Sequence, residues 1–306
     1  MHDQHSLPAF GDRLAAFAER RIDVAPSRVI GYREAGADRA EALPAVLLHG
    51  IGSGAASWVL QFEALGAARR VLAWDAPGYG ESTPVGLASP HAADYAETLA
   101  GWLDALGIAR CVLVGHSLGA IVAGRFAALH PGRVAGLLLL SPAGGYGAAS
   151  EAVRTQKRDS RLAMLTELGP QGLADQRSAN MLSPHASEPA RQWVRWNMAR
   201  IVPAGYAQAT HLLANADLAA DVAQYRGRIA VAVGAQDGIT PPEACARIAQ
   251  AAGVPLQTIP GAGHAGYIEA PDAYTTLIDA FAKQCEANES QHRSQHKSQH
   301  HRETNA

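Results

Sequence analysis

The sequence predicts an α/β protein with a doubly wound, mostly parallel sheet and an inserted helical cap. Short runs rich in Val, Ile and Leu alternate with helical patterns along most of the chain, as in a sheet that helices cover on both faces. Several runs are continuously apolar, which is typical of buried parallel strands. The alternation stops between residues 144 and 221, where the pattern is almost entirely helical.

These patterns divide the chain into parts. The expected strands are 28–36, 45–49, 70–75, 110–115, 134–141, 229–234 and 256–260, and the expected core helices are 91–106, 118–129, 242–252 and 272–285. We therefore expect an N-terminal extension at 1–27, a core made of 28–143 and 222–286, and a cap at 144–221. Residues 287–306 repeat Ser, Gln and His with nothing apolar to bury, which predicts a disordered tail. A helical tail would instead place His292, His296 and His300 on one face as a weak metal patch.

Composition narrows the class of protein. The chain has 306 residues, of which 48% are hydrophobic and 18% charged, and these are ordinary values for an enzyme-sized core. With a net charge of −2 and scattered Lys and Arg, we expect no nucleic-acid partner. No apolar run approaches the ~20 residues that span a bilayer, and the N-terminus lacks the apolar stretch of an export signal. We expect a cytoplasmic protein without membrane contact.

The stretch VLVGHSLGAIVAG at 112–124 contains the candidate nucleophile, Ser117. A strand pattern ends at Gly115 and a helical pattern begins at Leu118. Glycines two residues before and after the serine permit a sharp turn that exposes its hydroxyl at the carboxyl edge of the sheet. Because a free serine hydroxyl is a poor nucleophile at neutral pH, the chain must also supply a base and a carboxylate.

Two later strand ends offer these groups. Asp237 follows the strand pattern at 229–234, and His264 follows the one at 256–260 in a glycine-flanked loop. The order Ser, acid, His is the order associated with this kind of turn. His130, His185 and His211 fall on helical or cap segments and are better explained as surface or packing residues. We therefore predict a triad of Ser117, Asp237 and His264.

An oxyanion hole needs two backbone N–H groups directed at the developing charge. The N–H of Leu118, directly after the nucleophile, is one candidate. The other is the N–H of Ile51, in the glycine-containing loop HGIGSG that follows the strand at 45–49. We expect His49, at the base of that loop, to be a structural hydrogen-bonding residue and not an acid or base.

Five motifs in order resemble the α/β-hydrolase fold superfamily with a helical cap. They are HGIGSG at 49–54, DAPGYGES at 75–82, GHSLG at 115–119, GAQDGITP at 234–241 and GAGHAGYIEAP at 261–271. The resemblance spans about residues 28 to 284, and it implies the same triad and the same two oxyanion donors. It also implies that Asp75 belongs to a structural turn and is not catalytic.

The resemblance implies hydrolysis of a small-molecule carboxylic ester or lactone through an acyl-enzyme, without metal or organic cofactor. Relatives that open haloalkanes or epoxides carry an aspartate at the position of Ser117. Hydrolases of C–C bonds in vinylogous diketones usually have Asn before the nucleophile and Trp after the histidine, where this chain has His116 and Ala265. Such a hydrolase, a cofactor-free haloperoxidase and an acyltransferase remain alternatives. A binding protein on this fold is expected to lack a triad member.

The substrate pocket is expected between the turn at Ser117 and the cap. Aromatic and apolar residues in these segments are candidate lining residues, each with a packing role as the alternative. They are Trp58, Ile121, Tyr146, Trp193, Trp196 and Tyr267. The sequence leaves both a monomer and a homodimer open.

Overall fold

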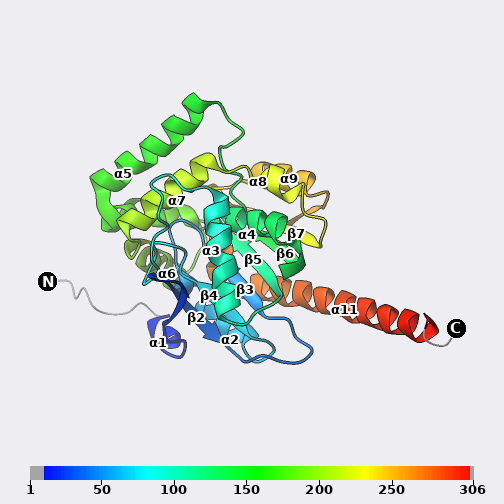
Figure 1. The fold of residues 1–306 in the computed structure, drawn as a ribbon. Helices are drawn as coiled ribbons and strands as arrows, with labels where there is room; N and C mark the ends of the chain where they lie inside the picture. The colour runs from blue at the N-terminus through cyan, green and yellow to red at the C-terminus, as the bar shows by residue number, and fades with distance from the viewer. Residues whose placement is uncertain (1–9, 304–306) are drawn as a thin grey trace.

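The computed structural model describes residues 10–303, with side chains as far as residue 289. Its centre is an eight-stranded sheet with the order β1-β2-β4-β3-β5-β6-β7-β8 (Figure 1). The strands are β1 (Arg20–Ala25), β2 (Arg28–Ala35), β3 (Ala45–Leu48), β4 (Val71–Trp74), β5 (Cys111–His116), β6 (Val134–Leu140), β7 (Ile229–Gly234) and β8 (Leu256–Ile259). Strands β3 to β8 are parallel, while β1 and β2 pair antiparallel. The predicted fold class is confirmed.

Alternate residues of the central strands pack into two separate cores. Val46 and Leu48 belong to the core beneath α3 (Ala92–Ala105) and α4 (Leu118–Leu129). Leu47, between them, belongs to the core beneath α2 (Val59–Leu65) and α11 (Pro271–Glu303). Because both faces are covered, these strands contain apolar residues at every position. The shorter elements are α1 (Gly11–Leu14), η1 (Ala55–Trp58), η2 (Pro131–Arg133), α9 (Pro242–Ala251) and α10 (Gly266–Glu269).

The chain between β6 and β7 is helical and contains no strand in the structure. Its helices are α5 (Glu151–Arg177), η3 (Ser178–Met181), α6 (Glu188–Ala199), α7 (Pro203–Asn215) and α8 (Leu218–Val222). Figure 1 shows α5, α6 and α7 together to one side of the sheet. Helix α5 is kinked at Gly169, whose φ is 62°, directly before Pro170. This insertion corresponds to the segment predicted as a cap, and we use the name cap for residues 144–221.

Two terminal segments differ from the expected organisation. Residues 20–25, expected in an N-terminal extension, form strand β1 at the edge of the sheet. Three of the six residues of this strand are charged, and only the half-buried Ile22 and Val24 face the core, so its apolar pattern is short. Charged side chains are typical of edge strands, where they discourage pairing with other chains.

The expected disordered tail is the other correction, because α11 continues as a helix to Glu303. No Gly or Pro interrupts the sequence after Pro271, and a helix that is already formed extends at low cost. The side chains of the suggested histidine patch lie outside the described residues. Within the described part of the chain, no helix is both long enough and apolar enough to cross a membrane.

The cap packs closely onto the core at two glycines. A Cβ atom added to Gly205 of α7 would lie 2.0 Å from the carbonyl oxygen of Gly78, which follows β4 and has a φ of 82°. A second contact joins the cap to the loop of His264. There the N–H of Ala265 donates to the carbonyl of Met181 at 2.7 Å. These contacts position the cap over the end of the sheet.

The glycine contact yields a stability prediction. Gly205→Ala should lower the free energy of unfolding by about 1–3 kcal/mol, because the added methyl group overpacks a backbone contact. Gly101→Ala is the matched control in α3, where an added Cβ would lie 3.5 Å from its nearest neighbour. That change should be neutral or stabilise by about 0.5–1 kcal/mol. Urea unfolding curves measure both, and equal effects of the two substitutions would contradict the proposed contact.

Candidate active site

Ser117 lies in a strained turn between β5 and α4. Its φ is 53° and its ψ is −114°, a conformation that residues other than glycine rarely adopt. The surrounding sheet supports the turn, since the N–H of Ser117 donates to the carbonyl of Leu140 at 3.1 Å. Strain of this kind is concentrated at functional sites, where the packed surroundings hold it in place.

The two glycines that flank the serine are required by close backbone contacts. A Cβ atom at Gly119 would lie 2.3 Å from the carbonyl oxygen of Leu48, at the end of β3. A Cβ atom at Gly115 would lie 2.6 Å from the Cα atom of Ala120. Any larger residue at these positions would push α4 away from the sheet, so the spacing of glycine and serine in the sequence has a steric cause.

His264 and Asp237 form a buried pair. His264 follows β8 and Asp237 follows β7, and their side chains are 1% and 0% exposed. The ring Nδ1 donates to Oδ2 of the carboxylate at 2.9 Å. The structure therefore brings together two residues that lie 27 positions apart, and the carboxylate fixes the ring so that its other nitrogen can exchange a proton.

The carboxylate of Asp237 also accepts backbone hydrogen bonds. Its Oδ1 accepts from the N–H of Ile239 at 2.8 Å and from the N–H of Thr240 at 2.9 Å. Burial by itself would raise the pKa of Asp237, but its hydrogen bond and charge interaction with His264, together with the Thr240 N–H, lower the pKa to about 2. Asp237 is therefore ionised at neutral pH and can stabilise a charged imidazole ring.

Thr240 is a site residue that the sequence reasoning missed. Its buried hydroxyl lies 2.9 Å from Oδ2 of Asp237, 3.1 Å from Nδ1 of His264 and 3.0 Å from the carbonyl of Ser141. It contacts both partners of the acid–histidine pair at the point where they meet. The available signal was its place in the motif GAQDGITP, three residues after the acid.

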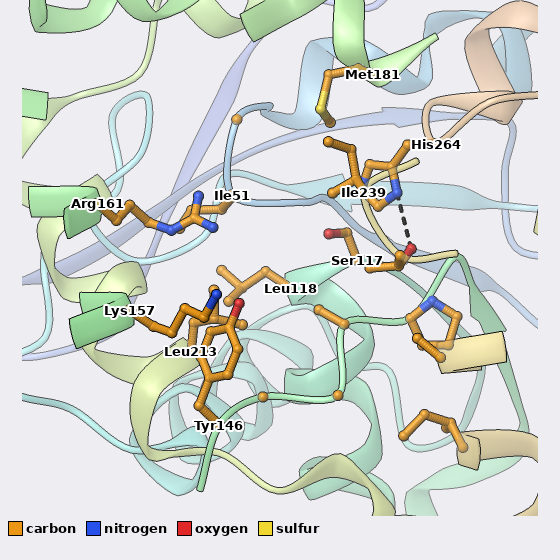
Figure 2. Close-up of a pocket in the computed structure, with 18 of the residues that line it drawn as sticks. Ile51, Ser117, Leu118, Tyr146, Lys157, Arg161, Met181, Leu213, Ile239 and His264 are labelled. Atoms are coloured by element: carbon orange, nitrogen blue, oxygen red, sulfur yellow. Dashed lines mark hydrogen bonds between the residues drawn. The ribbon is translucent and has the colours of Figure 1, made fainter. Parts of the chain in front are cut away.

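Ser117 and His264 line the same cavity, and Figure 2 shows their side chains next to each other on its wall. In the described part of the chain, Nε2 of His264 is buried and makes no hydrogen bond. Hydrogen bonds of this kind are often long before a substrate binds and tighten in the complex. The free nitrogen is thus available to accept the proton of the serine hydroxyl.

The loop after β3 presents the peptide between Gly50 and Ile51 to the site. A Cβ atom at Gly50 would lie 3.1 Å from the Cβ atom of Ser117. His49 accepts from the N–H of Ala76 through Nε2 at 3.0 Å, so its Nδ1 must carry the proton that it donates to the Gly50 carbonyl at 2.8 Å. In a trans peptide the N–H points away from the carbonyl. His49 thereby sets the direction of the Ile51 N–H, which agrees with the structural role expected for it.

Leu118 lies at the other side of the same space. It is the first residue of α4, and the first N–H groups of a helix have no partner within the helix. Figure 2 shows Leu118 and Ile51 on the cavity wall with Ser117. The arrangement suits two backbone donors that bind one oxygen atom.

His116 packs against the loop of His264 and forms a hydrogen bond with its backbone. Its Nε2 donates to the backbone carbonyl of His264 at 2.8 Å, and its ring lies 4.7 Å from the His264 ring and 4.8 Å from the Tyr267 ring. Burial, and next the adjacent His264 ring, lower the pKa of His116 to about 3. His116 is therefore neutral at physiological pH and acts as a hydrogen-bond donor.

The cavity has a volume of about 620 Å³, within the usual size of small-molecule pockets. Tyr146, one of the predicted lining residues, lies on its wall (Figure 2). The structure places the other five outside the cavity. They are Trp58, Ile121, Trp193, Trp196 and Tyr267.

These five side chains pack against other residues instead. Trp58 stacks on Tyr267 with ring centroids 4.1 Å apart, and Trp193 stacks on Trp196 at 4.7 Å. Ile121 is buried in the core beneath α4. The cap directs methionines at the cavity instead, among them Met181 and Met198. Large apolar side chains suit a core and a pocket equally well, so the sequence could not separate the two roles.

Asp75 and the three cysteines do not line the cavity. Asp75 is buried, accepts from the N–H of Ala55 at 2.8 Å and is not part of the cavity wall, which fits a role in the turn after β4. Among the described residues, no group of three or more His, Cys, Asp or Glu side chains is arranged to hold a metal ion. The three cysteines are free and buried.

Comparison with known proteins agrees with this fold. The chain belongs to the alpha/beta hydrolase family, whose model matches residues 45–277. The resemblance inferred from the five motifs is thereby confirmed.

Individual relatives differ in the reaction that their names describe. An esterase from Thermogutta terrifontis has a TM-score of 0.76 at 25% identity, over 88% of this chain and 99% of the other. The enol-lactonase from Burkholderia xenovorans LB400 has a TM-score of 0.76 at 24% identity, over 87% and 99%, a likeness that concerns the fold alone. A 2-hydroxy-6-oxo-6-phenylhexa-2,4-dienoate hydrolase from Comamonas testosteroni is 37% identical over 125 residues, which are 40% of this chain and 42% of that protein. The chain thus matches less than half the length of this curated relative.

The buried histidines yield a prediction for stability against pH. A histidine whose pKa is lower in the folded than in the unfolded chain contributes its full stability above about pH 6.5, the unfolded value, and loses it as the pH falls toward the folded value. With a folded pKa of about 3, His116 should cost roughly 2 kcal/mol of unfolding free energy between pH 7 and pH 5. His116→Gln keeps a donor near the His264 carbonyl but does not titrate, so its pH-dependent loss should be smaller by that amount.

Urea unfolding at pH 7 and pH 5 provides the measurement. The matched control is His185→Gln, at an exposed position in the cap. A His116→Gln protein with the same pH-dependent loss as the wild type would disprove the assignment of this proton to His116.

Proposed function

We propose that the protein is a serine hydrolase that cleaves a small-molecule carboxylic ester or lactone through an acyl-enzyme. The observation that carries the proposal is the strained Ser117 beside the buried His264–Asp237 pair, both at one cavity. A hydroxyl, a base and an orienting carboxylate in this relation are the groups that acyl transfer requires. The similarity to an esterase and membership of the alpha/beta hydrolase family support the same reaction class.

In the first half of the reaction, Oγ of Ser117 attacks the carbonyl carbon while Nε2 of His264 takes its proton. The carbonyl oxygen becomes an oxyanion between the N–H groups of Ile51 and Leu118, where loss of one donor costs roughly 3 kcal/mol. The intermediate collapses, the C–O bond to the alcohol breaks, and His264 gives its proton to the leaving oxygen. With a lactone, that alcohol stays attached to the acyl group.

In the second half, water replaces the alcohol. His264 takes a proton from the water molecule, whose oxygen attacks the acyl carbon of the ester on Ser117. Collapse of this intermediate returns the proton to Oγ and releases the carboxylic acid. Asp237 remains ionised throughout and stabilises the positive ring of His264 in both halves. The net reaction is ester plus water to acid plus alcohol.

Hydrolysis of a C–C bond is the second candidate, favoured by the similarity to the Comamonas testosteroni hydrolase. His116 and Ala265 differ from the residues usual in that class. In this chain both residues make structural hydrogen bonds. His116 donates to the carbonyl of His264, and the N–H of Ala265 donates to the carbonyl of Met181 in the cap. We therefore rank ester or lactone hydrolysis first.

A substrate panel tests the proposal. The panel contains p-nitrophenyl esters of graded acyl length, a set of lactones and a vinylogous 1,5-diketone, each offered to the wild type and to Ser117→Ala. We expect the wild type to cleave an ester or lactone and the substitution to reduce kcat/KM by at least about 10⁴-fold. Cleavage of the diketone alone would select the C–C reaction. Equal activity of both proteins would refute the nucleophile.

Covalent labelling provides a check that needs no substrate. A fluorophosphonate should modify Ser117, as located by peptide mass mapping. Labelling of Ser53 or Ser141 instead would overturn the assignment.

Thr240 yields a further prediction within this mechanism. Thr240→Val removes the hydroxyl that contacts Asp237 and His264, and it should lower kcat/KM by about 10- to 100-fold, the effect of losing a hydrogen bond to a charged group. Thr240→Ser should retain most of the activity. Thr258→Val, at an exposed position of β8, is the matched control. Full activity of Thr240→Val in the hydrolysis of the best ester would show that the hydroxyl has no part in orienting the pair.

A further inference from the structure

The wall of the active-site cavity has an excess of positive charge. Four cationic side chains line it, and the only carboxylate in the lining as described is that of Asp217. That carboxylate already caps α8, where it accepts from the N–H of Ala220 at 3.2 Å. The cations are Lys157, Arg161 and Arg177 of α5 and Arg247 of α9.

None of these four cations has a carboxylate partner among the side chains that the structure describes. Between residues 10 and 289 no salt bridge involves any of them, whereas Arg69 pairs with Asp279 and Arg125 pairs with Asp221. Like charges around one cavity repel each other, although water screens this repulsion more at the exposed Lys157, Arg177 and Arg247 than at the half-buried Arg161. An anion that enters the cavity would remove this repulsion, so the wall is suited to a negatively charged ligand.

Lys157 and Arg161 are the best placed of the four. They are four residues apart on α5 and so lie on one face of the helix. Figure 2 shows both side chains extending into the cavity from the side opposite His264. Arg161 is half-buried, and its Nη1 donates to the hydroxyl of Tyr206 at 3.2 Å. This contact fixes the guanidinium group while leaving other N–H donors to bind a ligand.

The surface between the two ends of the cavity is mainly apolar. Leu118 lies between Ser117 and the α5 cations in Figure 2, and Leu213 and Met164 also line the cavity. A ligand that spans the cavity would therefore present a reactive carbonyl at Ser117, an apolar middle and an anionic end at α5. Arginine binds carboxylates through paired hydrogen bonds, which gives this end geometric selectivity.

We infer that the substrate carries an anionic group, a carboxylate in addition to its ester or lactone bond, and that Lys157 and Arg161 bind this group. The inference rests on the proposed hydrolysis for the reactive end of the ligand. The anionic end rests separately on the unpaired cations of the cap.

Matched esters test the inference by steady-state kinetics. The first pair is p-nitrophenyl hexanoate and the p-nitrophenyl half-ester of adipic acid, which differ by a terminal carboxylate. The second pair is phenyl hexanoate and 4-carboxyphenyl hexanoate, which place the charge on the alcohol side. In at least one pair, kcat/KM of the wild type should be about 10- to 100-fold higher for the charged ester, as charge-assisted hydrogen bonds predict.

The double substitution Lys157→Gln/Arg161→Gln should abolish this preference, mainly through a higher KM for the charged ester, and should lower kcat/KM far less for the neutral ester. Arg158→Gln is the matched control on the same helix, since Arg158 pairs with Asp159 at 2.7 Å and does not line the cavity. Equal rates for the charged and neutral members of both pairs would overturn the inference. An equal loss on charged and neutral esters in the double variant would do the same.

Calorimetry separates this inference from the proposed reaction. In one outcome, the wild type binds adipate, loses this binding on the double substitution and cleaves no ester. That outcome would support the anion site and refute the hydrolysis. Ester hydrolysis without a charge preference and without adipate binding would refute the anion site and leave the hydrolysis standing.

Discussion

The close contact between the backbone of Gly119 and the carbonyl of Leu48 is the constraint on which the rest of the site depends. It places the start of α4 directly against the end of β3, so that Ser117 lies beside Gly50 and the loop that presents Ile51. In this position the backbone of Ser117 has an unfavourable positive φ, which the packed sheet beneath it maintains. Without the contact, the nucleophile and the two backbone donors would not share one cavity.

The loop of His264 is held by neighbours from three parts of the chain. His116 donates to the carbonyl of His264, and the carboxylate of Asp237 fixes its ring. The carboxylate of Glu269 accepts from the N–H of Gly263 at 2.9 Å and from the N–H of Ser183 at 3.0 Å, so it links this loop to the cap. The residues that orient the proposed base thus also position the helices that would select the substrate.

Much of the fold was predictable because its signals are local. Both faces of the sheet are buried, so each central strand is a continuous apolar run, and the turn at Ser117 requires glycines at fixed positions. The edge strand β1 was missed because half of it is exposed and polar. Thr240 was missed because a threonine gains its role only when the strands bearing Asp237 and His264 lie side by side.

The sequence by itself determined the fold class, the sharp turn that carries Ser117 and the chain order of serine, acid and histidine. These follow from short-range sterics and from apolar periodicity, and both signals are local in the sequence. Only the tertiary structure decided which side chains face the cavity. Tyr146 lies on its wall while Trp58 and Trp193 are buried elsewhere, because apolar residues pack equally well in a core or a pocket, and the choice depends on how the cap helices meet the sheet.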